Sequence, residues 1–131
     1  MKDKLEDILK KQDLLHDYVE FCTEDDRLTW SESDKQLWMV RQLTAAQAEI
    51  SEVIEETKFS KWWKNNPDKH AGLNESPDWS AIKEELIDVM FFVFSSMLCA
   101  GMTAEEIHSE YVKKWNKNMT RPDWDSAKGD R

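Results

Sequence analysis

Residues 86–98, LIDVMFFVFSSML, form a stretch that is apolar nearly all round the helix that it predicts. A helix of this kind must be covered on most of its sides. The stretch is also too short to span a bilayer. Only three glycines and three prolines occur in 131 residues, so few breaks interrupt long helices. The sequence therefore predicts an all-α fold, a bundle of four to five helices, with residues 86–98 at its centre.

The chain is long enough for one domain, expected over residues 1–125 and followed by a flexible tail at 126–131. Ser33 is expected to cap the second helix, Gly101 to end the third, and Thr103 with Glu106 to form a capping box for the fourth. A loop broken by prolines and glycine separates the second helix from the third. The predicted helices cover about residues 3–20, 34–57, 79–100 and 104–121.

Three other helices can cover only part of the apolar stretch in so short a chain. We therefore expect a second copy of the chain to cover the rest, in a homodimer or a dimer of dimers. The alternative is a compact monomer.

The net charge of -9 disfavours nucleic acids and anionic membranes as partners. An acidic protein that handles phosphates would need a cation in between. The two cysteines, Cys22 and Cys99, lack metal-binding spacing and are typical of reduced thiols. The first fifteen residues contain no apolar segment of signal-peptide length, so we expect a cytoplasmic protein.

Two pairs of acids are the first candidate functional feature. Glu49 and Glu52 lie three residues apart on one helical face, and Glu85 and Asp88 repeat that spacing on the next long helix. If the two helices are adjacent, the four carboxylates meet, and they cannot all stay ionised without a positive partner. Mg²⁺, with Mn²⁺ as a substitute, suits such oxygen ligands. The alternative is four solvated surface acids, although an unpaired Asp88 within the apolar stretch would be costly.

A second candidate feature lies on the last helix. Tyr111, Lys114, Asn118 and Arg121 fall within one narrow sector at about 100° per residue. Lysine and arginine bind phosphate oxygens, and tyrosine and asparagine add hydrogen-bond donors. The alternative is a set of surface ion pairs, each of which contributes little.

Three segments together resemble a known family: AEISEVIEETKFSKWWKN, EELIDVMFF and YVKKWNKNMTR. In the order E-x-x-E, K-x-W, E-x-x-D and Y-x-x-K-x-x-x-N-x-x-R, they resemble the dimeric all-α dUTPases. These belong to the MazG-like superfamily of nucleoside triphosphate pyrophosphohydrolases, and the bacteriophage dCTPase-dUTPases of that superfamily are similar as well. The resemblance extends from about Gln12 to Trp124.

The resemblance implies hydrolysis of dUTP, and of dCTP as a further substrate, to the monophosphate and pyrophosphate. This activity belongs to pyrimidine nucleotide metabolism or to nucleotide-pool sanitation. Glu49 or Glu52 would accept the proton of the attacking water, and all four acids would bind Mg²⁺. The phosphate-binding residues would be Lys61, Tyr111, Lys114, Asn118 and Arg121. The candidate base-binding residues are Gln12, His16 and Trp63. Gln12 could pair with a pyrimidine edge, and His16 is either a base contact or a satisfied polar residue on its helix. Trp63, Trp30 or Trp38 could stack on the base, and the alternative for each tryptophan is core packing.

The chain departs from the family pattern at three places. Phe91 stands where members often carry histidine, His16 follows Gln12 where members often carry asparagine, and the last motif ends in RPDW. These changes leave the choice between uracil and cytosine open. A dCTP-preferring enzyme or a broad house-cleaning dNTP pyrophosphatase remains an alternative.

Two further classes of protein are alternatives to this enzyme. A di-iron bundle needs two Glu-x-x-His motifs, and only Glu105 with His108 supplies one. A helical oligomeric adaptor without enzymatic activity would leave Asp88 and the ordered motifs as coincidences.

Overall fold

The computed structural model describes residues 3–18, 24–58 and 76–121, which contain five helices and no strand. The all-α fold is therefore confirmed. The tail at 126–131 and most of the expected loop before the third predicted helix lie outside the described residues. The helices are α1 (Lys4–Tyr18), α2 (Glu24–Thr29), α3 (Glu32–Glu56), α4 (Trp79–Cys99) and α5 (Ala104–Met119).

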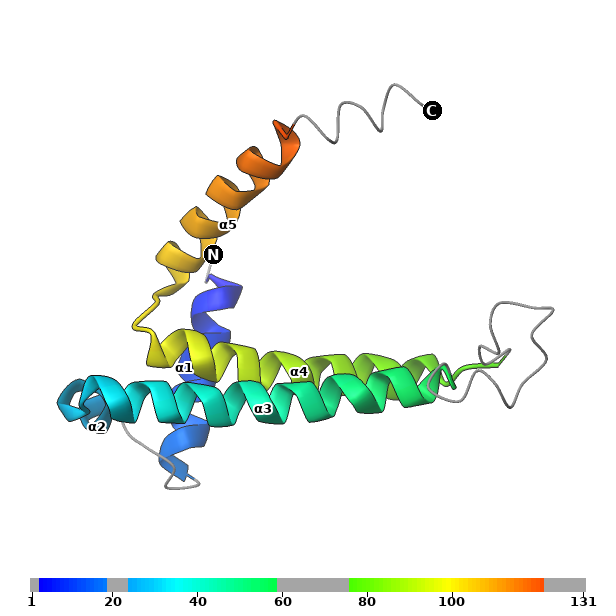
Figure 1. Cartoon of the computed structure of the whole chain (residues 1–131), viewed down its shortest axis with the longest axis horizontal. Coiled ribbons are helices and arrows are strands. Elements are labelled where there is room, and N and C mark those ends of the chain that lie inside the picture. Colours follow the sequence, from blue (N-terminus) through cyan, green and yellow to red (C-terminus); the bar gives the residue numbers. More distant parts are fainter. Residues whose placement is uncertain (1–2, 19–23, 59–75, 122–131) are drawn as a thin grey trace.

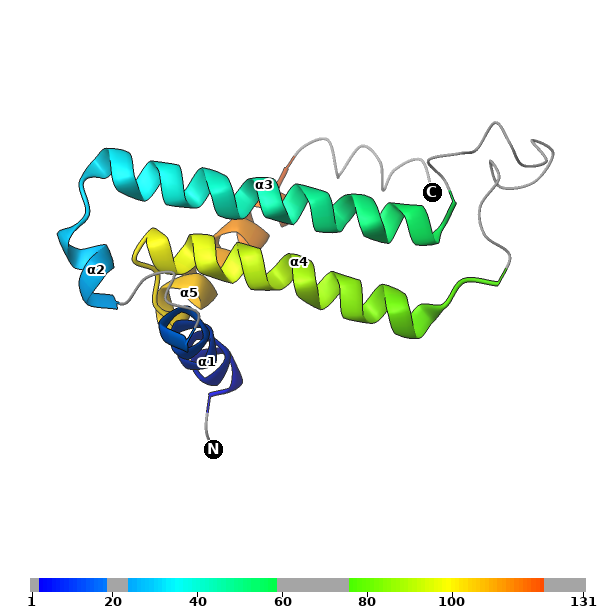
Figure 2. The ribbon, with the colours of Figure 1, turned by 90° about the horizontal axis from the view of Figure 1, so that it is seen from below.

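Helices α3 and α4 are the two longest elements and lie antiparallel, side by side (Figures 1 and 2). Helix α1 crosses beside α4, and the short α2 leads into the start of α3 (Figure 2). Helix α5 departs from the end of α4 with a bend of 104° between the two axes (Figure 1). No single described helix is long and apolar enough to cross a membrane.

The start of α3 differs from its prediction. Ser31, not Ser33, is the N-cap: its hydroxyl accepts a hydrogen bond from the Asp34 amide at 3.1 Å. The Asp34 carboxylate accepts one in return from the Ser31 amide at 3.3 Å. Capping at Ser31 lets a carboxylate close the reciprocal pair, and a carboxylate is a stronger acceptor than the Gln36 amide that Ser33 would use.

The ends of α4 and α5 agree with the sequence. Gly101 has a φ of +78°, and its amide donates to the Leu98 carbonyl at 2.9 Å. The Met102 amide donates to the Met97 carbonyl at 3.0 Å, which completes a Schellman motif. Thr103 then caps α5 by accepting a hydrogen bond from the Glu106 amide at 3.1 Å.

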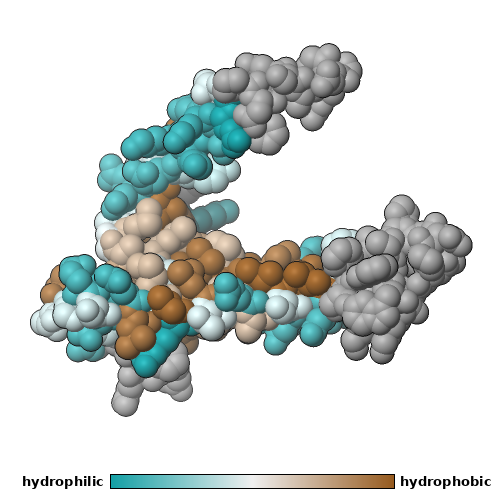
Figure 3. Space-filling view, viewed as in Figure 1, coloured by the Kyte–Doolittle hydropathy of each residue, from teal (hydrophilic) through white to brown (hydrophobic). Residues whose placement is uncertain are grey.

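The interior of one chain is small and unusually polar. The buried apolar residues among those described are Leu9, Ala46, Ile82 and Cys99. The buried polar residues are Gln12, His16, Gln42, Ser95 and Ser96. Large apolar side chains stay exposed on α4 and α5, including Leu86, Ile87, Trp115 and Met119, and hydrophobic residues gather along the α3–α4 pair (Figure 3). The described residues of one chain therefore cover the apolar stretch only in part, and the oligomeric state stays a prediction.

Candidate functional site

Three carboxylates from two helices meet between α3 and α4. Glu49 of α3, Glu85 of α4 and Asp88 of α4 each offer an oxygen, and these atoms all lie within 4.8 Å of one another. All three side chains are half-buried. The antiparallel pairing brings the two acidic spacings to the same level, as the sequence predicts.

Glu52 interacts with two members of this cluster while remaining exposed itself. The pKa of Glu85 is raised to about 7. The causes are the hydrogen bond with Glu52, the loss of water around Glu85 and repulsion by the charge of Glu52. The hydrogen bond with Glu52, burial and repulsion by Glu52 also raise the pKa of Glu49. The cluster therefore holds more negative charge than its surroundings stabilise.

Two oxygen atoms of the cluster are buried and have no hydrogen-bond partner among the described residues. These atoms are Glu49 Oε2 and Glu85 Oε2. Carboxylate oxygens left without a donor are costly unless a cation joins them. A set of carboxylate oxygens is also the donor set that hard divalent cations prefer, so the residues fit a divalent metal ion.

A cavity of about 330 Å³ adjoins these carboxylates. Helices α1, α3 and α4 all contribute to its wall. The lining residues are Gln12, Leu15, His16, Gln42, Glu49, Asp88, Phe91, Phe92 and Ser95. Two residues predicted to bind a base, Gln12 and His16, therefore share one cavity with two residues predicted to bind metal, Glu49 and Asp88.

Hydrogen bonds tie α1 to α4 at the wall of this cavity. Gln12 Nε2 donates to the Phe91 carbonyl at 2.9 Å and to Ser95 Oγ at 2.8 Å. His16 Nε2 lies 2.8 Å from the same Ser95 oxygen. The His16 ring also meets the Trp38 ring edge to face, with centroids 5.7 Å apart.

Gln42 and Ser95 are cavity residues that the sequence reasoning missed. Ser95 follows Asp88 by seven residues and Gln42 precedes Glu49 by seven, so each lies two helical turns from an acid on the same face. Since the helices are antiparallel, both steps lead toward the same end of the pair. That spacing, with polar residues in an otherwise apolar setting, is the signal that could have found them.

The other predicted site residues are not brought to the cavity within one chain. Tyr111 and Lys114 are exposed on α5, Asn118 is half-buried there, and Arg121 is exposed two residues beyond the end of this helix. Neither α5 nor Arg121 contributes to the lining of the cavity. Lys61 and Trp63 lie outside the described residues. The helix that carries the predicted phosphate ligands turns away from α4 (Figure 1).

The proposed di-iron ligands also remain isolated. Glu105 and His108 both lie near the start of α5, and neither joins a cluster of possible metal ligands in the described part of the chain. The structure therefore gives the di-iron alternative no support.

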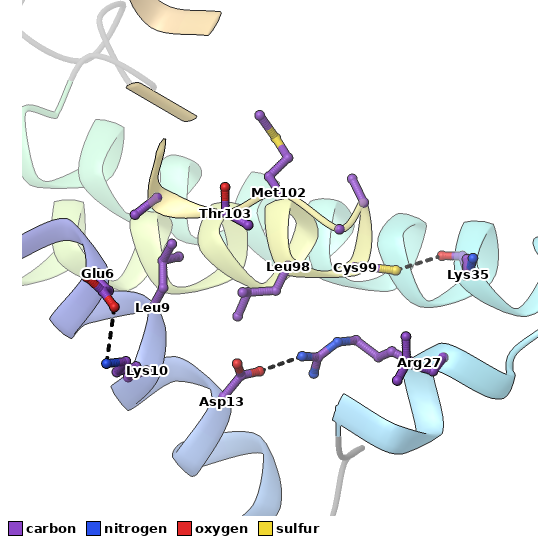
Figure 4. Close-up of a pocket in the computed structure, with 14 residues that line it drawn as sticks. Glu6, Leu9, Lys10, Asp13, Arg27, Lys35, Leu98, Cys99, Met102 and Thr103 are labelled. Carbon is purple, nitrogen blue, oxygen red and sulfur yellow. Dashed lines mark hydrogen bonds and ion pairs between the residues drawn. The ribbon is translucent and has the colours of Figure 1, made fainter. Parts of the chain in front are cut away.

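A second cavity, of about 520 Å³, lies where α1, α2 and the α4–α5 joint meet (Figure 4). Its charged side chains are already paired. Lys10 lies 3.2 Å from Glu6, and Arg27 lies 2.6 Å from Asp13 (Figure 4). Lys35, the remaining charged lining residue, lies 3.5 Å from Glu32. Each charged side chain of this cavity therefore has a partner of opposite charge, unlike the acids of the carboxylate site.

The fold and site define an all-α protein whose acidic cluster adjoins a cavity with polar and aromatic walls. A family model described as dUTPase matches residues 4–100. The chain belongs to this family, the all-α dUTPases, and is a hydrolase that acts on dUTP. No curated protein and no solved structure matches the chain. The matched residues include Gln12, His16 and all four acids, but end before α5 begins.

Family membership decides between an enzyme and a non-enzymatic adaptor, two classes that the sequence alone left open. An adaptor without enzymatic activity is disfavoured, because the chain belongs to a family of hydrolases.

Proposed function

We propose that the protein converts dUTP to dUMP and pyrophosphate in a Mg²⁺-dependent reaction, at the cavity between α1, α3 and α4. The observation that carries this proposal is that Gln12 and His16 line the same cavity as Glu49 and Asp88. A nucleotide with its base against α1 would have its phosphates beside the carboxylates.

The metal would be held by the carboxylates of Glu49, Glu52, Glu85 and Asp88. It would be Mg²⁺, with Mn²⁺ as a substitute. When bound, Mg²⁺ would offset phosphate charge and acidify a water molecule. Two buried oxygens without a hydrogen-bond partner among the described residues support this assignment, because a cation supplies the partner that they lack.

Glu49 and Glu52 are the proposed proton acceptors for the attacking water. Glu49 belongs to the acid cluster and Glu52 interacts with it, so both carboxylates lie beside the proposed metal site, where the attacking water would be. Glu85 and Asp88 would bind metal only.

The phosphate-binding residues are proposed to be Lys61, Tyr111, Lys114, Asn118 and Arg121. Because α5 leads away from the carboxylates of its own chain, we propose that a second copy supplies the groups on and directly after this helix, which are Tyr111, Lys114, Asn118 and Arg121. The exposed apolar side chains of α4 and α5 support a homodimer or a dimer of dimers, since a partner would bury them. Trp63 is proposed to stack on the base.

The base preference is proposed as uracil, with dCTP as a further substrate. A dCTP-preferring enzyme and a broad dNTP pyrophosphatase are the alternatives. We propose a role in pyrimidine nucleotide metabolism or nucleotide-pool sanitation in the cytoplasm, which the two cysteines without metal-binding spacing support.

The test is pyrophosphate release from dUTP, dCTP, dTTP, dATP and dGTP with Mg²⁺, measured for the unchanged chain and for Glu52→Gln. We expect dUTP to be the best substrate, and Glu52→Gln to lower kcat by about 100-fold or more, as general-base loss does. Glu55→Gln is the matched control, because Glu55 is exposed on α3 outside the cluster. Full activity in Glu52→Gln would reject its assignment, and release from no nucleotide would reject the function.

A further inference from the structure

Ser95 is the most deeply buried polar side chain in the described part of the chain, together with His16, and the proposed reaction has not used it. It lies on α4 two turns beyond Asp88 and lines the same cavity. Its hydroxyl is close to groups from α1 and from α4 itself. Ser95 therefore connects the proposed base-binding helix to the helix that carries the acids.

The hydrogen-bond capacity of Gln12 fixes the direction of its amide. The Nε2 group carries two hydrogens, and these go to the Phe91 carbonyl and to Ser95 Oγ. The Phe91 carbonyl only accepts, so it requires the nitrogen and not Oε1 on its side, and Ser95 Oγ accepts the second hydrogen and thereby fixes the plane of the amide. Gln12 is left with Oε1, an acceptor, for any ligand in the cavity.

The protonation of His16 does not change this result. The Ser95 hydroxyl has one hydrogen, which goes either to the Phe91 carbonyl at 3.0 Å or to His16 Nε2 at 2.8 Å. In both arrangements Ser95 Oγ keeps a lone pair for Gln12 Nε2. The Gln12 carbonyl oxygen therefore stays available to a ligand in either state of the histidine.

Gln42 differs from Gln12 in this respect. Its side chain is buried and lines the cavity from α3, yet it forms no side-chain hydrogen bond with the described residues. Its amide is free to present either its oxygen or its nitrogen. The cavity thus offers one fixed acceptor on α1 and one adaptable amide on α3.

We propose that Ser95 is a positioning residue that sets base selectivity by holding the Gln12 carbonyl toward the base, and that Gln42 is a second base-reading residue. This inference rests on the proposed function. Uracil has an N–H at ring position 3 with a carbonyl on either side. Gln12 Oε1 accepts that N–H, and Gln42 Nε2 donates to a neighbouring carbonyl. Cytosine carries a bare nitrogen at position 3, which the fixed acceptor repels.

The experiment compares Ser95→Ala with Ser96→Ala. Ser96 is the matched control because it is buried on the same helix and donates to the Phe92 carbonyl at 3.0 Å, but does not line the cavity. Loss of one well-placed hydrogen bond corresponds to roughly a tenfold change. We expect Ser95→Ala to raise the KM for dUTP about tenfold, with kcat within about twofold, and to lower the dUTP to dCTP ratio of kcat/KM by a similar factor.

If Ser95 had a purely structural role, its loss would lower kcat/KM equally for dUTP and dCTP. A change in the ratio of the two kcat/KM values therefore distinguishes positioning of Gln12 from an effect on folding. Ser95→Thr keeps the hydroxyl and should keep the selectivity. Gln42→Ala should raise the KM for dUTP while Gln36→Ala, an exposed site on α3, should not. Unchanged selectivity in Ser95→Ala, or an equal loss in Ser96→Ala, would overturn the role of Ser95.

A second measurement keeps this inference distinct from the reaction. Deoxyuridine lacks phosphates, so it probes base binding without turnover, and the side-chain amide signals of Gln12 and Gln42 report its binding by NMR. Both signals should shift in the unchanged chain and in Ser96→Ala, and should shift less in Ser95→Ala. No shift of the Gln12 signal with deoxyuridine would overturn the inference, whereas shifts without pyrophosphate release would reject the proposed function alone.

Discussion

Glu49 of α3 and Asp88 of α4 place carboxylate oxygens within 4.8 Å of each other, and both residues line the cavity that Gln12 closes from α1. Acidic side chains at this distance repel unless protons or cations intervene. The pairing of the two long helices therefore creates a site whose negative charge protons or cations must offset.

The first prediction concerns pH and stability without divalent ions. The pKa of Glu85 is about 7 in the folded chain, above the usual 4.5 that applies when unfolded. Between these values the folded state keeps a proton that the unfolded state has lost. The free energy of unfolding should therefore fall as the pH rises through this window.

Urea unfolding with a chelator, at about pH 5 and about pH 8, measures this effect. In Glu85→Gln the free energy of unfolding should fall less between these pH values, because the amide does not titrate. Glu84→Gln, an exposed neighbour outside the cluster, should leave this fall unchanged. An identical pH dependence in all three proteins would contradict the account.

The second prediction concerns metal binding. At roughly 100 times its Kd, Mg²⁺ should stabilise the fold by about 2.7 kcal/mol, since it binds the folded state alone. The rise in Tm should be larger at about pH 8 than at about pH 5, because binding requires ionised carboxylates. Calorimetry should show that Asp88→Asn loses most of this rise and that Glu84→Gln keeps it. Equal Tm values with Mg²⁺ and with chelator would oppose the metal site.

The third prediction concerns the phosphate contacts of α5. Lys114→Ala should raise the KM for dUTP by about tenfold or more, as expected for loss of a charge-assisted hydrogen bond. Lys113→Ala removes an equal charge from a different face of the same helix and should have little effect. Steady-state kinetics at fixed ionic strength separate the two variants. Equal effects would indicate that general charge, not a defined contact, is responsible.

The fourth prediction tests whether α5 acts on a second copy. Glu49→Gln and Arg121→Ala should each be nearly inactive alone. In a heterodimer, one site receives an intact acid cluster from one chain and an intact Arg121, just beyond α5, from the other. A 1:1 mixture, unfolded and refolded together, should therefore recover about a quarter of full activity for a two-fold symmetric dimer. Recovery of none would place both groups in one chain.

The fifth prediction concerns the start of α3. Ser31→Ala removes the N-cap hydroxyl and should lower the free energy of unfolding by about 1 kcal/mol. Ser33→Ala replaces an exposed serine that forms no capping bond, and should change the free energy of unfolding by less than about 0.5 kcal/mol. Urea unfolding of both variants gives the comparison. A larger loss in Ser33→Ala would restore the cap expected from sequence.

Much of the fold was predictable because its signals are local. The φ of Gly101 and the cap at Thr103 follow from the residues themselves, and the helix spacing of Glu49, Glu85 and Asp88 fixes which face each acid occupies. Helix α2 was missed because six residues give too little periodicity to identify. The Ser31 cap was missed because two serines compete there, and the better partner is Asp34.

The remaining features depend on contacts between distant segments. Ser95 gains its role from a glutamine and a histidine on another helix, and nothing within α4 predicts that meeting. Gln42 likewise matters only because α3 and α4 are antiparallel. The direction of α5 does not follow from the periodicity of its own residues, so the sequence placed Lys114 and Arg121 on one face without fixing where that face points.

That direction depends on a single backbone joint. Gly101 carries the positive φ between α4 and α5, and a Cβ built there would meet no atom within 4 Å. Space alone would therefore admit a side chain here, whereas the left-handed backbone of the Schellman motif favours glycine. An L-residue at this position would strain the joint and disturb the direction of α5 without touching the acid cluster, so substitution of Gly101 offers a way to separate assembly from metal affinity.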